Sequence, residues 1–92
     1  MNPPTHKADV AEALLKERYF QDHKWGTIAE NPHTLGEWLL LVEAELAEAK
    51  TALIKGGKGR DSVRSEIIQV AALCMACMEQ HGLDDPHEGR QV

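Results

Sequence analysis

Apolar residues recur at helical spacing along most of the chain, and no segment shows the alternation of apolar and polar residues that marks a strand. Aromatic and β-branched residues are few, whereas Ala and Leu are abundant. The pattern therefore predicts an all-α fold of three helices in a single domain, residues 1–92. The expected helices span about residues 8–22, 34–55 and 62–80.

Capping and turn residues separate these helices. Thr34 and Glu37 form the sequence signature of a capping box, in which each side chain accepts a hydrogen bond from the other residue's backbone amide. The glycine-rich residues 56–60 end the second helix and are expected to form a flexible connector. Either Asp61 or Ser62 is expected to cap the third helix.

The first helix is expected to place apolar residues inside and charged residues in solvent. Its expected inner residues are Val10, Ala13, Leu14 and Phe20. Its expected solvent-facing residues are Lys7, Glu12, Lys16, Glu17 and Arg18.

The third helix is apolar almost all the way round between Ile67 and Met78. A surface helix in a three-helix monomer would show a polar face. A second subunit is therefore expected to cover it, giving a helical-bundle homodimer or tetramer with this helix at its centre. Cys74 and Cys77 lie within the same run, and we expect them to be buried, reduced core residues.

The chain is acidic, with a formal net charge of −5 and a pI near 5.4. This balance argues against a nucleic-acid polymer as the main partner, because phosphate backbones need a basic surface. It allows a small phosphorylated ligand whose charge a bound cation neutralises. No signal peptide is seen, and the longest uncharged apolar run is too short to cross a bilayer. We expect a cytoplasmic protein with no membrane partner.

Two pairs of polar residues interrupt the second and third helices, each pair at i, i+3 spacing. They are Glu45 with Glu48, and Glu66 with Gln69. Residues three apart share a helix face, and burying unpaired carboxylates beside the apolar neighbours would be costly. A hard divalent cation removes that cost, so the pattern predicts a Mg²⁺ site formed by these four residues between the two helices. The alternatives are glutamates solvated on an exposed helix side, and a Gln69 that forms hydrogen bonds across the dimer.

Three segments together resemble the MazG-like proteins, the all-α nucleoside triphosphate pyrophosphohydrolase superfamily that includes the dimeric dUTPases. They are residues 17–26, 37–49 and 63–72. The superfamily motif is E-E-x-x-E, a spacer, and E-x-x-D. Here it reads Ala44-Glu45-Leu-Ala-Glu48 and Glu66-Ile-Ile-Gln69. The chain thus departs from the motif at Ala44 and Gln69, and the E-x-x-Q-V-A-A form is typical of a subgroup.

The resemblance implies Mg²⁺-dependent hydrolysis of a nucleoside triphosphate to a monophosphate and pyrophosphate. Phosphoryl transfer needs mainly positioning and charge neutralisation, which three carboxylates and one amide oxygen around Mg²⁺ would supply. Glu48 is the expected group that orients the attacking water. Two other interpretations stay open. One is a nucleotide-binding protein with little turnover, because Gln69 is uncharged, and the other is a purely structural helical dimerisation unit.

Aromatic and basic residues supply the candidate substrate contacts. Trp25, His33 and Trp38 are candidate base contacts, because nucleobases stack on indole rings. Packing in the core is the alternative for both tryptophans. Four basic residues around the connector are candidates to close over the triphosphate, although a solvated turn would explain them equally well. They are Lys55, Lys58, Arg60 and Arg64.

Overall fold

Residues 3–87 are described by the computed structural model, and their regular secondary structure is entirely helical. The elements are α1 (Lys7–Trp25), α2 (Leu35–Lys55), the short 3₁₀ turn η1 (Gly59–Asp61) and α3 (Val63–His81). The predicted all-α fold with three helices is confirmed. The largest difference from the expected bounds is that α1 continues to Trp25, past residue 22.

Side-chain caps form the beginnings of α2 and α3. The Thr34 hydroxyl accepts a hydrogen bond from the Glu37 amide at 3.1 Å, and the Glu37 carboxylate accepts one from the Thr34 amide at 2.8 Å. The predicted capping box is therefore confirmed. Ser62, rather than Asp61, caps α3, because its hydroxyl accepts a hydrogen bond from the Ser65 amide at 3.1 Å.

The connector between α2 and α3 contains η1. Gly56 ends α2 with a φ of 70°, a left-handed conformation that favours glycine. A Cβ on Gly57 would lie 2.1 Å from the backbone oxygen of Asp61, so a glycine is needed where η1 approaches the end of α2. This close approach brings the N-terminus of α3 back beside α2.

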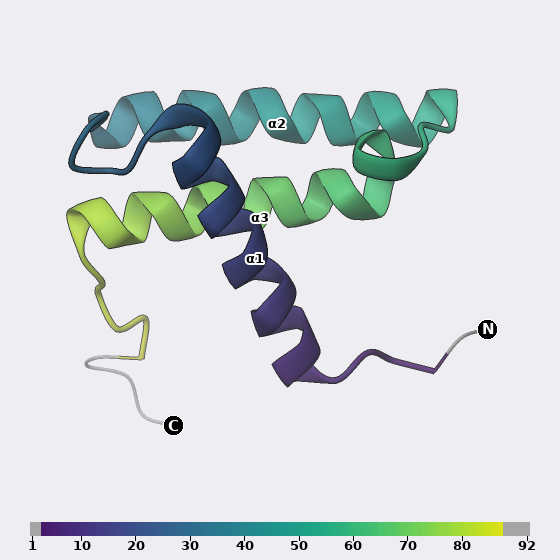
Figure 1. Cartoon of the computed structure of the whole chain (residues 1–92), viewed down its shortest axis with the longest axis horizontal. Helices are drawn as coiled ribbons and strands as arrows, with labels where there is room; N and C mark the ends of the chain where they lie inside the picture. Colours follow the sequence, from purple (N-terminus) through teal and green to yellow (C-terminus); the bar gives the residue numbers. More distant parts are fainter. Residues whose placement is uncertain (1–2, 88–92) are drawn as a thin grey trace.

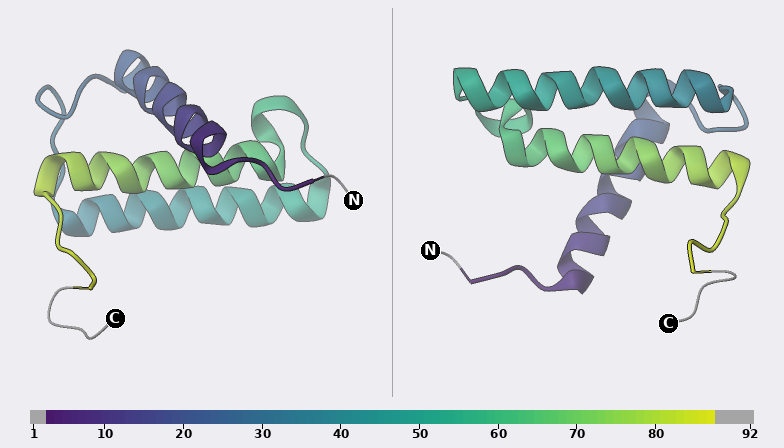
Figure 2. Two further views of the ribbon diagram at one scale, coloured as in Figure 1. Left: turned by 90° about the horizontal axis from the view of Figure 1, so that it is seen from below. Right: turned by 180° about the vertical axis from the view of Figure 1, so that it is seen from behind.

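Helices α2 and α3 form an antiparallel hairpin, and α1 crosses one side of it, where it packs on α3 (Figure 1). The N-terminal half of α1 extends beyond the hairpin, as the view from behind also shows (Figure 2, right). The small core lies between α2 and α3 and contains Trp38, Leu73 and Ala76. Cys74 and Cys77 are free thiols, and both are half-buried. Cys77 packs against the core, so the expected core position applies to Cys77 in part.

Helix α1 contacts α3 and η1 largely through polar side chains, which corrects part of the predicted orientation of α1. Ala13 and Leu14 are half-buried, in line with the prediction. Glu17, Arg18 and Gln21 are buried, whereas Val10 and Phe20 are exposed. The prediction that Glu17 and Arg18 face solvent is therefore wrong. Burial of these groups is tolerated because they form hydrogen bonds and ion pairs. Arg18 pairs with Asp22 and Glu79, Glu17 pairs with Arg60, and Gln21 contacts Glu17 and the backbone oxygen of Gln69.

Helices α2 and α3 also carry apolar side chains that the other described residues leave exposed. On α2, Leu39, Leu46 and Leu53 are 67%, 45% and 72% exposed, and their seven-residue spacing places them in one stripe. On α3, Ile67 and Met78 are exposed. We call the three leucines on α2 the outer face. Helix α3 therefore has a buried side as well as an exposed one, and the longer exposed apolar stripe lies on α2.

None of the helices within residues 3–87 has an apolar stretch long enough to cross a membrane.

Candidate metal centre and adjoining cavity

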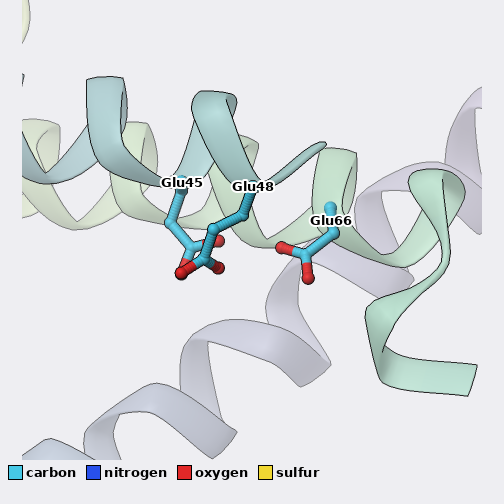
Figure 3. A group of neighbouring side chains, drawn as sticks. All are labelled: Glu45, Glu48 and Glu66. Carbon is cyan, nitrogen blue, oxygen red and sulfur yellow. The ribbon is translucent and has the colours of Figure 1, made fainter. Parts of the chain in front are cut away.

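Three carboxylates meet where the middle of α2 faces the first turns of α3. Glu45 and Glu48 share one side of α2, and Glu66 faces them from α3 (Figure 3). One oxygen of each residue lies within 4.8 Å of one oxygen of each of the other two. The i, i+3 spacing and the antiparallel hairpin together explain this convergence. The structure thus brings together the three predicted carboxylate ligands.

Two of these carboxylates carry a buried oxygen that has no hydrogen-bond partner among residues 3–87. These atoms are Oε2 of Glu45 and Oε2 of Glu66, and the Glu66 residue is only 5% exposed. Burial, together with the neighbouring carboxylates of Glu66 and Glu48, raises the pKa of Glu45 to about 7. Unpartnered buried carboxylate oxygens are strongly unfavourable in a protein without a compensating cation. The donor set therefore fits a hard divalent cation, which carboxylate oxygens prefer.

Gln69, the fourth predicted ligand, lies one turn after Glu66 and is buried, but its amide nitrogen faces the connector. It donates hydrogen bonds to the backbone oxygen of Arg60 at 2.9 Å and to the Ser65 hydroxyl at 3.2 Å. These contacts tie η1 to α3. Gln69 thus has a structural contact that the sequence did not indicate, and its role as a metal ligand stays a prediction.

Arg60 is held by α1 instead of being free to close over a ligand. Its guanidinium donates hydrogen bonds to both carboxylate oxygens of Glu17, at 3.0 and 2.7 Å, and lies 4.1 Å from the centroid of the Phe20 ring. The hydrogen bonds to Glu17 raise the pKa of Arg60, and the charges of Glu45 and Glu66 act in the same direction. Arg60 therefore supplies positive charge beside the carboxylates.

Of the other three basic residues predicted to contact the triphosphate, only Lys55 lies in the wall of a cavity beside the carboxylates. Lys55 lines a second cavity of about 430 Å³, which also includes Glu48 and Glu66 in its wall. Lys58 and Arg64 are exposed, and neither lines the two cavities found beside the carboxylates. The structure thus places Lys55 beside the candidate metal centre, but it brings neither Lys58 nor Arg64 to the wall of either of these two cavities.

The first cavity, of about 370 Å³, joins the carboxylates to the predicted base contacts. Its wall includes Trp25, His33 and Trp38 as well as Glu45 and Glu48. Trp38 also belongs to the core. The same side chain therefore packs in the core and lines the cavity in which a base contact was predicted. The predicted substrate-binding aromatics and two predicted metal ligands therefore share one cavity.

Polar residues that the sequence did not single out complete this wall. They are Arg18, Gln21, Asp22 and Asn31. Arg18 donates hydrogen bonds to Asp22 at 2.9 Å and to Gln21 at 3.2 Å, which fixes the α1 side of the cavity. The i, i+4 spacing of Arg18 and Asp22 was a usable signal for an ion pair on the helix, although it could not show that the pair is buried.

Comparison of the chain with protein-family models, with curated proteins and with solved structures found no match in any of the three. The resemblance to the MazG-like superfamily therefore stays a prediction based on the quoted motifs. The functional argument below rests on the carboxylate cluster and the cavity.

Proposed function

We propose that the chain is a Mg²⁺-dependent nucleoside triphosphate pyrophosphohydrolase of the MazG-like type, which releases a nucleoside monophosphate and pyrophosphate. The observation that carries the proposal is the first cavity, which connects Trp25 and Trp38 to Glu45 and Glu48. Aromatic walls suit a planar base, and the buried, unpartnered oxygens of the cluster suit a cation that binds phosphates.

The spacing along α2 agrees with a ligand that has a base at one end and phosphates at the other. Trp38 precedes Glu45 by seven residues, which corresponds to about 10 Å along the helix axis. Glu45 and Glu66, which carry the unpartnered oxygens, are the ligands that would hold Mg²⁺ most directly. When bound, Mg²⁺ neutralises phosphate charge.

Glu48 is the best candidate to orient and deprotonate the attacking water. It is the most exposed of the three carboxylates, and it lines both cavities. A carboxylate in this position would have access to solvent water. Lys55, in the wall of the second cavity, would supply a positive charge for the leaving pyrophosphate.

We also propose that the protein acts as a homodimer or a dimer of dimers in the cytoplasm. The chain exposes 7352 Å² of surface, whereas a compact monomer of 10.2 kDa is expected to expose about 5,300 Å². The outer face adds a long apolar stripe to that surface. A second copy of the chain, packed through the outer face, is the simplest cover for it.

The test is a screen of ribo- and deoxyribonucleoside triphosphates with Mg²⁺, in which pyrophosphate release is measured with and without a chelator. Metal-dependent release supports the proposal. Metal-dependent nucleotide binding without release would favour the low-turnover binding protein. Absence of both binding and release would contradict the proposed function.

The raised pKa of Glu45 gives Mg²⁺ binding a defined pH dependence. Because the folded-state pKa of about 7 lies above the usual 4.5, the metal-free fold loses stability as pH rises between these two values. Mg²⁺ competes with this proton, so its apparent affinity should rise about tenfold per pH unit up to pH 7 and then level off. Thermal melts at pH 5.5 and pH 8 are expected to show the larger Mg²⁺-induced stabilisation at pH 8.

Glu45→Gln is the control for this experiment. The variant has no carboxyl proton at this position, so its weaker Mg²⁺ response is expected to depend much less on pH. Equal Mg²⁺-induced stabilisation of the wild-type protein at both pH values would contradict the assignment of Glu45 as a ligand.

A further inference from the structure

Gln80, in the last turn of α3, makes three hydrogen bonds to two residues that line the first cavity. Its side-chain oxygen accepts from the His33 amide at 3.0 Å and from the Trp38 indole nitrogen at 2.8 Å. Its side-chain nitrogen donates to the His33 backbone oxygen at 2.6 Å. The neighbouring His81 ring also contacts that oxygen, at 2.8 Å. Gln80 thus joins the end of α3 to the aromatic side of the cavity, although it does not line the cavity itself.

These bonds hold the indole ring of Trp38 and the backbone of residue 33, from which the His33 ring extends. The His33 ring packs edge-to-face on Trp38, with ring centroids 4.8 Å apart and an interplanar angle of 83°. The indole nitrogen of Trp38 is already engaged by Gln80, which leaves the ring to act on a ligand by packing alone. Elsewhere in residues 26–34, the side-chain hydrogen bonds are local, such as those between Thr27 and Glu30.

We propose that Gln80 is a positioning residue that fixes the aromatic wall formed by His33 and Trp38, and thereby determines which planar rings the cavity accepts. This role rests on the proposed function, because it assigns the base end of the ligand to this wall. Gln80 acts only through the two aromatic residues. Its loss should therefore change substrate binding and base preference more than the chemical step.

Substitutions at position 80 separate this role from simple support of the helix end. Gln80→Met has a similar length but can form none of the three hydrogen bonds. Gln80→Glu keeps an acceptor for the His33 amide and the Trp38 indole, but it loses the donor to the His33 backbone oxygen. We therefore expect Gln80→Glu to recover part of what Gln80→Met loses. The matched control is Met78→Ala, since Met78 lies in the same region of α3 and is exposed.

The experiment compares steady-state pyrophosphate release by the four proteins with purine and pyrimidine nucleoside triphosphates at saturating Mg²⁺. For Gln80→Met we expect KM to rise roughly tenfold, kcat to change less than about twofold, and the ratio of purine to pyrimidine kcat/KM to change. Gln80→Glu should be intermediate, and Met78→Ala should resemble the wild-type protein. The Mg²⁺-induced melting shift without nucleotide should be the same in all four, because the carboxylates are untouched.

Other outcomes overturn this role. A Gln80→Met protein with wild-type KM and base preference, or one whose changes match those of Met78→Ala, would show that Gln80 only supports the helix end. If the wild-type protein neither binds nor hydrolyses any nucleotide, the proposed function fails and the role of Gln80 fails with it. An active wild-type protein with an unaffected Gln80→Met variant overturns the role of Gln80 alone.

Discussion

Replacing Glu66 by glutamine is expected to reduce Mg²⁺-dependent pyrophosphate release by at least about 10²-fold, because it removes one charge from the cation site. The same change should stabilise the metal-free protein. The substituted side chain is 5% exposed and carries an unpartnered carboxylate oxygen close to Glu45. Relieving that repulsion is worth on the order of 1–3 kcal/mol, or a rise in melting temperature of several degrees.

Activity assays and thermal melts on the same preparations measure both effects. Glu43→Gln is the matched control, because Glu43 is an exposed glutamate on α2 outside the cluster. It should leave both the activity and the melting temperature unchanged. If Glu66→Gln retained wild-type turnover, the carboxylate cluster would not be the metal site.

Replacing Leu46 by glutamate is expected to dissociate the protein into folded monomers. Leu46 lies in the middle of the outer face and is 45% exposed in the single chain, so the substitution should cost the isolated fold little. In a two-fold symmetric dimer the change introduces two uncompensated charges, which should raise the dissociation constant on the order of 10³-fold. Light scattering at micromolar concentration measures the mass, and circular dichroism checks the helix content.

Tyr19→Glu provides the comparison for this second experiment. Tyr19 is exposed on α1 and does not belong to the outer face, so its replacement should leave the mass of the assembly unchanged. A monomeric wild-type protein, or a Leu46→Glu variant with the wild-type mass, would refute the proposed assembly through the outer face.

The helices and the carboxylate cluster were predictable because both depend on residues near one another in sequence. Apolar periodicity and the capping box define α2, and i, i+3 spacing places Glu45 and Glu48 on one side of it. A single connector then brings Glu66 opposite them. Forming the helices and one connector is therefore enough to bring the three carboxylates together.

The polar contacts between distant segments were not predictable in the same way. Glu17 and Arg60 are 43 positions apart, and nothing in either local sequence identifies the other as a partner. Glu17 was assigned to the solvent side because it is charged, although its i+3 and i+7 spacing from Leu14 and Val10 places it on their side of the helix. The orientations of the Gln69 and Gln80 amides depend on backbone groups of the connector and of residue 33, whose positions only the assembled fold defines.

The polar contact of α1 with α3 and η1 makes the attachment of α1 sensitive to ionic strength. Its ion pairs include Glu79 and Arg60, whose side chains are 48% and 41% exposed, so dissolved salt screens them in part. Helix α1 also supplies Arg18, Gln21, Asp22 and Trp25 to the wall of the first cavity. Because α1 forms that side of the cavity, salt that weakens these ion pairs is expected to weaken ligand binding in the cavity as well.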